Sequence, residues 1–126
     1  METGRISDSE MKVMELLWNS KKMTSVAEIT EILNNNGESW THQTVGTFLK
    51  RLETKGLINS SKKGKSLYYF PLISKEKFMS NQTHKFLKTN FDGSLRGFLT
   101  AFSSEKKFSK EEIQDLKDWF DEIDFK

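Results

Sequence analysis

Residues 41–70 read THQTVGTFLKRLETKGLINSSKKGKSLYYF, and this stretch decides the fold because it places a two-faced helix directly before a lysine-rich hairpin. At about 100° per residue, one side of the helix is apolar. That side carries Val45, Phe48, Leu49 and Leu52. The opposite side, centred roughly 150° away by the same geometry, carries Gln43, Thr44, Thr47, Lys50 and Arg51. One face can pack on a core while the other stays free for a partner.

The polar face carries side chains that suit DNA recognition. Arg can make paired hydrogen bonds to guanine, Gln can pair with adenine, and Thr can meet a thymine methyl or a phosphate. Thr44, Gly46 and Thr47 are poor helix formers, whereas a solvated helix more often has Ala, Glu or Lys at such positions. We therefore predict that the face reads DNA; the alternative is a polar surface that contacts nothing. The predicted contacts are Thr41, His42, Gln43, Thr44, Thr47, Lys50 and Arg51.

The hairpin after the helix predicts a second DNA contact. Residues 57–61 and 66–70 favour strands, and the turn chemistry of residues 62–65 lies between them. Pro71, the only proline, ends the hairpin. Charged hairpin tips also keep edge strands soluble. Their position after the reading helix favours phosphate contact by Lys62, Lys63 and Lys65, with a strong salt dependence.

Two shorter helices are predicted before residue 41. The segments that start at Ser7 and Ser25 have capping-box spacing, with Glu10 and Glu28 three residues later, and apolar residues then recur at helical intervals. The run of residues 34–37, NNNG, ends the second helix. Three helices and a hairpin predict a winged helix-turn-helix domain over residues 1–73.

Residues 74–126 predict a helical dimerisation domain. One helix runs from Ser74 to about Thr89, a second spans residues 95–102, and a third starts at the capping box of Ser109. Their apolar stripes need a partner, and a second copy is the most economical one because helix-turn-helix proteins usually bind as two-fold dimers. The alternative is that these helices fold back on the first domain. The predicted interface is Phe86, Leu87, Leu95, Phe98, Leu99, Phe102, Ile113, Leu116, Phe120 and Ile123. The expected fold class is mainly α with a small β-hairpin wing.

The composition narrows the function further. The 126 residues have a net charge of +2, so the basic cluster between residues 50 and 65 is a local feature. There is no cysteine, which excludes disulfides and thiolate metal sites. The two histidines, His42 and His84, form no catalytic constellation with the scattered acidic residues. We expect a cytoplasmic protein with no cofactor, no metal, no enzymatic activity and no direct membrane binding, since no signal-peptide core or apolar span is present.

Three segments carry a resemblance to a known family. Residues 6–18 (ISDSEMKVMELLW), 25–33 (SVAEITEIL) and 44–58 (TVGTFLKRLETKGLI) resemble the bacterial penicillinase-repressor family. That family includes repressors of β-lactamase and methicillin-resistance genes and a copper-responsive branch. The resemblance implies a homodimer on double-stranded DNA, with one winged domain on each half of an inverted-repeat operator, and a role in antibiotic resistance.

The resemblance also implies a release mechanism, with two departures in this chain. In the β-lactam branch a membrane sensor with a metallopeptidase domain triggers cleavage of the repressor at an Asn-Phe bond, and Ala101-Phe102 aligns there. The Phe remains but the Asn does not. Gly46 stands where several β-lactam regulators carry Arg, so operator preference is expected to differ. The copper branch uses a cysteine hook, which this chain cannot form.

Two other functions stay open at the level of sequence. One is a winged-helix module that binds an acidic protein partner through the same basic face. The other is a regulator released by a small molecule, with a pocket among Phe78, Phe86, Phe98 and Phe102, although these residues are more simply interface core.

Overall fold

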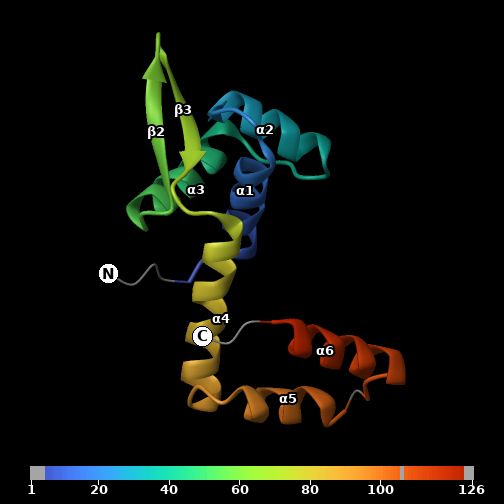
Figure 1. Cartoon of the computed structure of the whole chain (residues 1–126). Helices are drawn as coiled ribbons and strands as arrows, with labels where there is room; N and C mark the ends of the chain where they lie inside the picture. Colours follow the sequence, from blue (N-terminus) through green and yellow to red (C-terminus); the bar gives the residue numbers. More distant parts are fainter. Residues whose placement is uncertain (1–4, 106, 124–126) are drawn as a thin grey trace. The chain divides into compact units, whose positions relative to one another are not determined.

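The computed structural model describes residues 5–105 and 107–123, so the outermost ends of the two predicted domains lie outside it. Six helices and three short strands follow one another along these residues (Figure 1). In chain order they are α1 (Asp8–Asn19), β1 (Thr24–Ser25), α2 (Val26–Asn35), α3 (His42–Thr54), β2 (Ile58–Lys63), β3 (Ser66–Pro71), α4 (Lys75–Phe91), α5 (Leu95–Ser103) and α6 (Lys110–Glu122). The predicted fold class, mainly α with a small wing, is confirmed.

The three predicted capping boxes all form. At the starts of α1, α2 and α6, a serine side chain accepts a hydrogen bond from the backbone N–H of a glutamate three residues later, and that glutamate accepts one from the serine N–H. The serines are Ser7, Ser25 and Ser109. Each box satisfies two backbone donors that the helix itself leaves unpaired. Short-range chemistry therefore determines where these helices begin.

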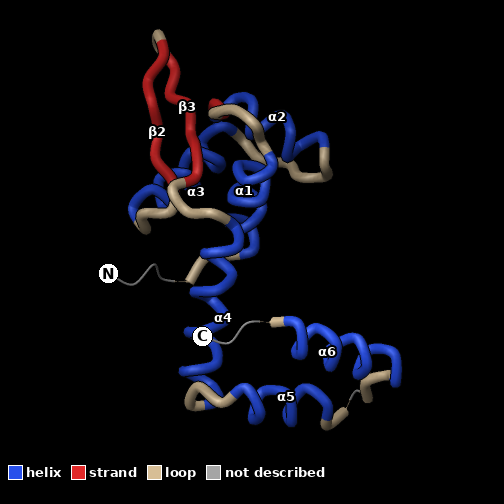
Figure 2. The backbone as a smooth tube through the Cα atoms, viewed as in Figure 1, coloured by secondary structure: helices blue, strands red, loops and turns tan. Residues whose placement is uncertain are grey.

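The sheet differs from the predicted hairpin in two respects. It has three strands in the order β1-β3-β2, because Thr24 and Ser25 pair antiparallel with Tyr69 and Tyr68. The predicted four-residue turn is also wrong in extent: Lys62 and Lys63 belong to β2, and only Gly64 and Lys65 form the turn. Gly64 has φ +64°, the conformation that the first loop residue of a two-residue type II′ hairpin requires. Strands β2 and β3, drawn in red in Figure 2, therefore stay paired almost to the tip of the hairpin.

Helix α4 ends two residues later than the sequence pattern predicts. Asn90 and Phe91 continue the helix, and the Asn90 side-chain amide donates to the Phe86 carbonyl at 3.0 Å. The chain turns only at Asp92 (φ +49°) and Gly93 (φ +81°). The pair of positive φ angles, rather than Asn90-Phe91, therefore separates α4 from α5.

One hydrophobic core holds α1, α2, α3 and the sheet together. It contains Val13, Met14, Leu16, Leu17, Ile29, Leu33, Val45, Leu49, Leu52, Leu57, Ile58, Tyr69 and Phe78. The apolar stripe predicted for α3 contributes Val45, Leu49 and Leu52, each fully buried, while Phe48 packs at the edge. This burial leaves the opposite side of α3 facing solvent.

The chain divides into two compact units after Met79, within α4. The first unit contains the core and the sheet. In the second unit, five phenylalanines form a chain of ring contacts with centroids 5.3–6.2 Å apart: Phe86, Phe91, Phe98, Phe102 and Phe108. Yet none of the described residues after Met79 is buried. This unit lacks a closed core of its own.

Candidate nucleic-acid interface

The N-terminal end of α3 is held by the turn that precedes it. The Asn34 side chain, at the end of α2, donates to the Trp40 carbonyl at 2.9 Å and accepts from the Trp40 N–H at 2.8 Å. The Trp40 ring then packs edge-on against Phe48, with centroids 5.1 Å apart. Thr41 caps the helix by accepting from the Thr44 N–H at 3.1 Å. These contacts determine the direction in which α3 leaves α2.

The C-terminal end of α3 closes with a Schellman motif. Gly56, at φ +77°, donates its N–H to the Glu53 carbonyl, and Leu57 donates to the Leu52 carbonyl at 3.1 Å. The φ of Gly56 is one that a side chain disfavours. As predicted, glycine ends the helix here and turns the chain into β2.

A largely buried ion pair ties α3 to α1. The Lys55 ammonium contacts the Glu10 carboxylate at 3.1 Å and also donates to the Arg5 carbonyl at 2.9 Å. Burial raises the pKa of Glu10, but hydrogen bonds from the Ser7 N–H and from Lys55 outweigh it and hold the pKa below the ordinary glutamate value. The carboxylate therefore stays charged at neutral pH and holds the end of α3 in place.

The structure leaves most of the residues predicted to contact DNA open to solvent, but His42 and the N-cap Thr41 lie off the side of α3 that carries the other five. Thr41, His42, Gln43, Thr47, Lys50 and Arg51 are exposed, and Thr44 is half-buried. The Thr41 hydroxyl donates to the Thr44 hydroxyl, and the Thr47 hydroxyl donates to the Gln43 carbonyl at 3.0 Å. The threonine hydroxyls are thus engaged by the helix itself, while Gln43, Lys50 and Arg51 extend outward.

The wing lysines do not point the same way. Residues directly opposite in a sheet share a face and successive residues alternate. Lys62 pairs with Leu67 and lies on the face of Ile58 and Tyr69, which packs on the core. Lys63 pairs with Ser66 and lies on the other face, and Lys65 occupies the turn. We therefore expect the three lysines to meet different phosphates.

The basic side chains of this surface are not neutralised within the protein. In the part of the chain that the structure describes, neither Lys50, Arg51 nor the lysines of the wing forms an ion pair. Glu53, on the last turns of α3, accepts from the Ser60 hydroxyl at 3.4 Å and points toward the sheet. Its charge, next to Tyr69, joins burial in raising the pKa of that tyrosine. A positive surface of this kind attracts a polyanion.

The residues predicted for a dimer interface lie on all three helices of the second unit. Phe86 and Leu87 are on α4, the next four are on α5, Ile113, Leu116 and Phe120 are on α6, and Ile123 caps α6. Phe86, Leu95 and Phe102 are each about half exposed, at 48%, 51% and 47%. These side chains have the apolar area that a protein interface needs.

Sequence reasoning missed three aromatic residues of this surface. Phe91 and Phe108 belong to the chain of phenylalanine rings, and Trp119 is 51% exposed on α6. Two signals could have found them. Trp119 follows Leu116 by three residues, and Phe108 directly precedes the Ser109 cap, where an apolar residue often packs on the helix.

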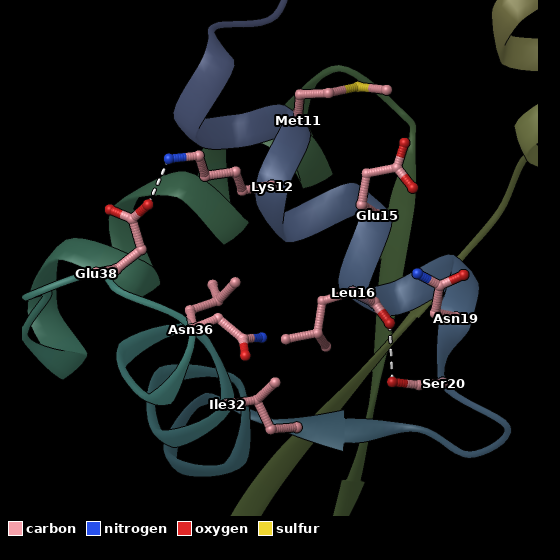
Figure 3. Close-up of a pocket in the computed structure, with 10 residues that line it drawn as sticks. Met11, Lys12, Glu15, Leu16, Asn19, Ser20, Ile32, Asn36 and Glu38 are labelled. Carbon is pink, nitrogen blue, oxygen red and sulfur yellow. Dashed lines mark hydrogen bonds and ion pairs between the residues drawn. The ribbon is translucent and has the colours of Figure 1, made fainter.

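A groove of about 550 Å³ lies on the first unit between α1 and α2 (Figure 3). Met11, Leu16 and Ile32 form its apolar part, and an ion pair between Lys12 and Glu38 crosses one rim. None of the residues predicted to contact DNA lines it. The groove is therefore separate from the reading surface.

Residues 5–105 and 107–123 contain no cluster of His, Asp and Glu side chains able to hold a metal ion. No helix among those described is long and apolar enough to cross a membrane.

The chain is similar to known repressor proteins over most of its length. The sequence profile of the penicillinase repressor family matches residues 6–122. The penicillinase repressor of Bacillus licheniformis is 30% identical over 112 residues, covering 89% of this chain and 86% of that protein. The methicillin resistance regulatory protein MecI of Staphylococcus aureus (strain N315) is 27% identical over 116 residues, covering 92% and 93%. A solution structure of the DNA-binding domain of the repressor BlaI matches with a TM-score of 0.53 and 31% identity, covering 61% of this chain and 93% of that domain.

Proposed function

Because this chain belongs to the penicillinase repressor family, whose members are DNA-binding transcriptional repressors and not enzymes, we propose that it represses transcription as a homodimer on an inverted-repeat operator. Each winged domain would occupy one half of the repeat. Half-sites about one helical turn apart match the two-fold symmetry of such a dimer. Since its target is chromosomal DNA, we place the protein in the cytoplasm.

The observation that carries this proposal is the outward face of α3 beside the wing. Gln43, Lys50 and Arg51 are exposed on a helix whose other face is buried, and neither Lys50 nor Arg51 forms an ion pair within the described residues. Arg and Gln can read base edges in the major groove, while the wing lysines contact phosphates. The similarity of this unit to the DNA-binding domain of BlaI supports a DNA-binding role for it.

The dimer is supported by the second unit. None of its described residues is fully buried, yet α5 and α6 each carry a row of half-exposed apolar side chains. Exposed apolar patches of this size mark protein interfaces. A second copy of the chain would cover both helices at once and would bring the two reading helices into one molecule.

We further propose that proteolysis at Ala101-Phe102 releases the repressor from DNA. Both residues are exposed, in the last turn of α5. The Ala101 carbonyl accepts from the Ser104 hydroxyl at 2.8 Å and from its N–H at 3.4 Å. A protease responding to a membrane sensor metallopeptidase would have to unwind only this final turn, and the cut would divide the apolar row of α5 from α6.

The experiment is a binding titration across salt concentration. Fluorescence anisotropy of the full chain would be measured on a labelled inverted-repeat fragment from the promoter of its own gene, and on a shuffled duplex. We expect tighter binding to the promoter fragment, and log affinity that falls linearly with log salt with a slope of about −0.9 for each phosphate neutralised. Affinity indifferent to both sequence and salt would contradict the proposal.

A second titration distinguishes DNA binding as such from binding by a two-fold dimer. If the dimer places two half-sites in register, inserting five base pairs between the halves turns them to opposite sides of the duplex and should weaken binding strongly. An unchanged affinity after that insertion would leave a DNA-binding protein without the proposed two-fold arrangement.

A further inference from the structure

Thr47 has the central position on the reading face of α3. At about 100° per residue, the directions of Gln43, Thr44, Thr47, Lys50 and Arg51 average to the direction of Thr47 itself. The side chain is exposed, and the buried residue Val45 lies on the far side of the helix. A helix that enters a groove with this face first therefore brings Thr47 nearest to the base edges.

The hydroxyl of Thr47 is turned back onto the helix. It donates to the Gln43 carbonyl at 3.0 Å, the usual satisfaction of a threonine within a helix. The other two substituents of Cβ are the γ-methyl and a hydrogen, so a hydroxyl held against the backbone leaves the methyl as the one heavy-atom group of this side chain that is available to a partner. The centre of the reading face is thus apolar, although the residue there is a polar one.

The neighbours of Thr47 allow a close approach. Gly46, about 100° round the helix from Thr47, has no side chain, and an added Cβ there would meet nothing within 4 Å. Thr44 is half-buried, and its hydroxyl belongs to the cap made with Thr41. The other helical neighbours, Gln43, Lys50 and Arg51, carry long and flexible side chains. The short side chain of Thr44 and the absence of one at Gly46 leave room beside Thr47 for a base to approach its methyl.

We infer that Thr47 recognises a thymine in each operator half-site through contact between its γ-methyl and the thymine 5-methyl group. This inference rests on the proposed function, and it names the base that one residue of the reading face selects. Thymine alone among the four bases presents a methyl group in the major groove. The Thr47 hydroxyl bonds the helix backbone and does not take part in selecting the base.

The test compares thymine with deoxyuridine, which lacks only the 5-methyl group. The full chain first selects its preferred inverted repeat from a random duplex pool, and each thymine of the half-site is then replaced in turn by deoxyuridine. We expect one position where the replacement weakens binding of the unaltered protein roughly fourfold, the effect of one buried methyl. The readout is the ratio of the two dissociation constants.

Three variants assign that ratio to the methyl of Thr47. Thr47→Ser keeps the hydroxyl and loses the methyl, so it should bind thymine and deoxyuridine equally at that position. Thr47→Val keeps the methyl and should retain the fourfold preference. Thr54→Ser is the matched control, because the Thr54 hydroxyl makes the same bond to the Lys50 carbonyl at 2.9 Å, about two turns farther from the end of the helix that enters the groove. It should keep the preference.

The outcomes separate this inference from the proposed function. Selection of a repeat without any methyl-dependent position, or a preference that persists in Thr47→Ser, would overturn the role of Thr47 and leave the repressor intact. A preference lost in Thr47→Val would assign the reading to the hydroxyl instead, and overturn the inference. Failure to select any sequence would overturn both.

Discussion

Single residues of α3 and of the wing are expected to contribute differently to DNA binding, some to sequence selection and others to charge attraction. Arg51 extends from the reading face, whereas Lys63 lies on the outer face of the wing. We predict that Arg51→Ala reduces discrimination between operator and random DNA by about 1–3 kcal/mol, because a paired contact to a base edge is lost. The measurement is the ratio of the two affinities by anisotropy.

Lys63→Ala is the comparison for Arg51→Ala. Removing one phosphate contact should weaken operator and random DNA alike and should reduce the salt slope by about one. Equal losses on both DNAs for Arg51→Ala would instead give Arg51 the role of a phosphate contact.

Two glycines of the same helix have opposite structural roles. Gly46 has an ordinary helical φ and open space around it, while Gly56 stands at φ +77°. We predict that Gly46→Ala raises the free energy of unfolding by about 0.5–1 kcal/mol, since alanine restricts the unfolded chain and favours helix. Urea denaturation measures this change.

Gly56→Ala should destabilise the protein in the same assay, because alanine is strained at that positive φ. If Gly46→Ala is also less stable than the unaltered chain, then the surface around Gly46 is not open.

Between elements, the ion pair of Glu10 and Lys55 couples α1 to the reading helix. The pKa of Glu10 is lower in the folded protein than in the unfolded chain, so the folded state binds fewer protons as the pH falls. This contribution to stability is therefore complete at neutral pH and is lost as the pH falls through the folded pKa, on the acid side of the ordinary glutamate range.

We predict that Glu10→Gln lowers the free energy of unfolding at pH 7 by about 1–2 kcal/mol, because a charge-assisted hydrogen bond to Lys55 is lost. The difference from the unaltered chain should shrink as the pH is lowered. Denaturation between neutral and acidic pH measures both effects. Glu31→Gln, an exposed position on α2, should change stability by less than about 0.5 kcal/mol. A pH-independent loss for Glu10→Gln would show that the carboxylate acts only by its shape.

For the whole molecule, the proposed function has the apolar helices after Met79 pack against a second chain. We predict that Leu99→Asp yields monomers, because a carboxylate would be transferred into an apolar interface without a partner. Operator binding should weaken greatly, since each half-site would then be held by one winged domain alone. Sedimentation velocity measures the mass of the particle.

Thr100→Asp is the control for Leu99→Asp. It introduces the same charge one residue later, on the side of α5 away from the apolar row, where the Thr100 hydroxyl donates to the Arg96 carbonyl. This variant should remain dimeric. A dimeric Leu99→Asp protein would move the interface to other residues, with Leu116 and Trp119 on α6 the next to test.

The sequence by itself determined the features that depend on short-range chemistry. Capping boxes at Ser7, Ser25 and Ser109, the glycine that ends α3, and the two faces of α3 all involve residues within a few positions of one another. Local propensity and helical periodicity are sufficient for such features. For the same reason the side of α3 that is free to read DNA was predictable.

Only the tertiary structure decided what depends on distant pairing. Strand β1 exists because Thr24 and Ser25 meet Tyr69 and Tyr68, some 44 residues later by the pairing register. The register of β2 with β3 sends Lys62 and Lys63 to opposite faces, and a hydrogen bond to the Gln43 carbonyl holds the Thr47 hydroxyl against the helix backbone. Sequence patterns list which side chains are available, but hydrogen-bond geometry and strand register set the direction in which each one points.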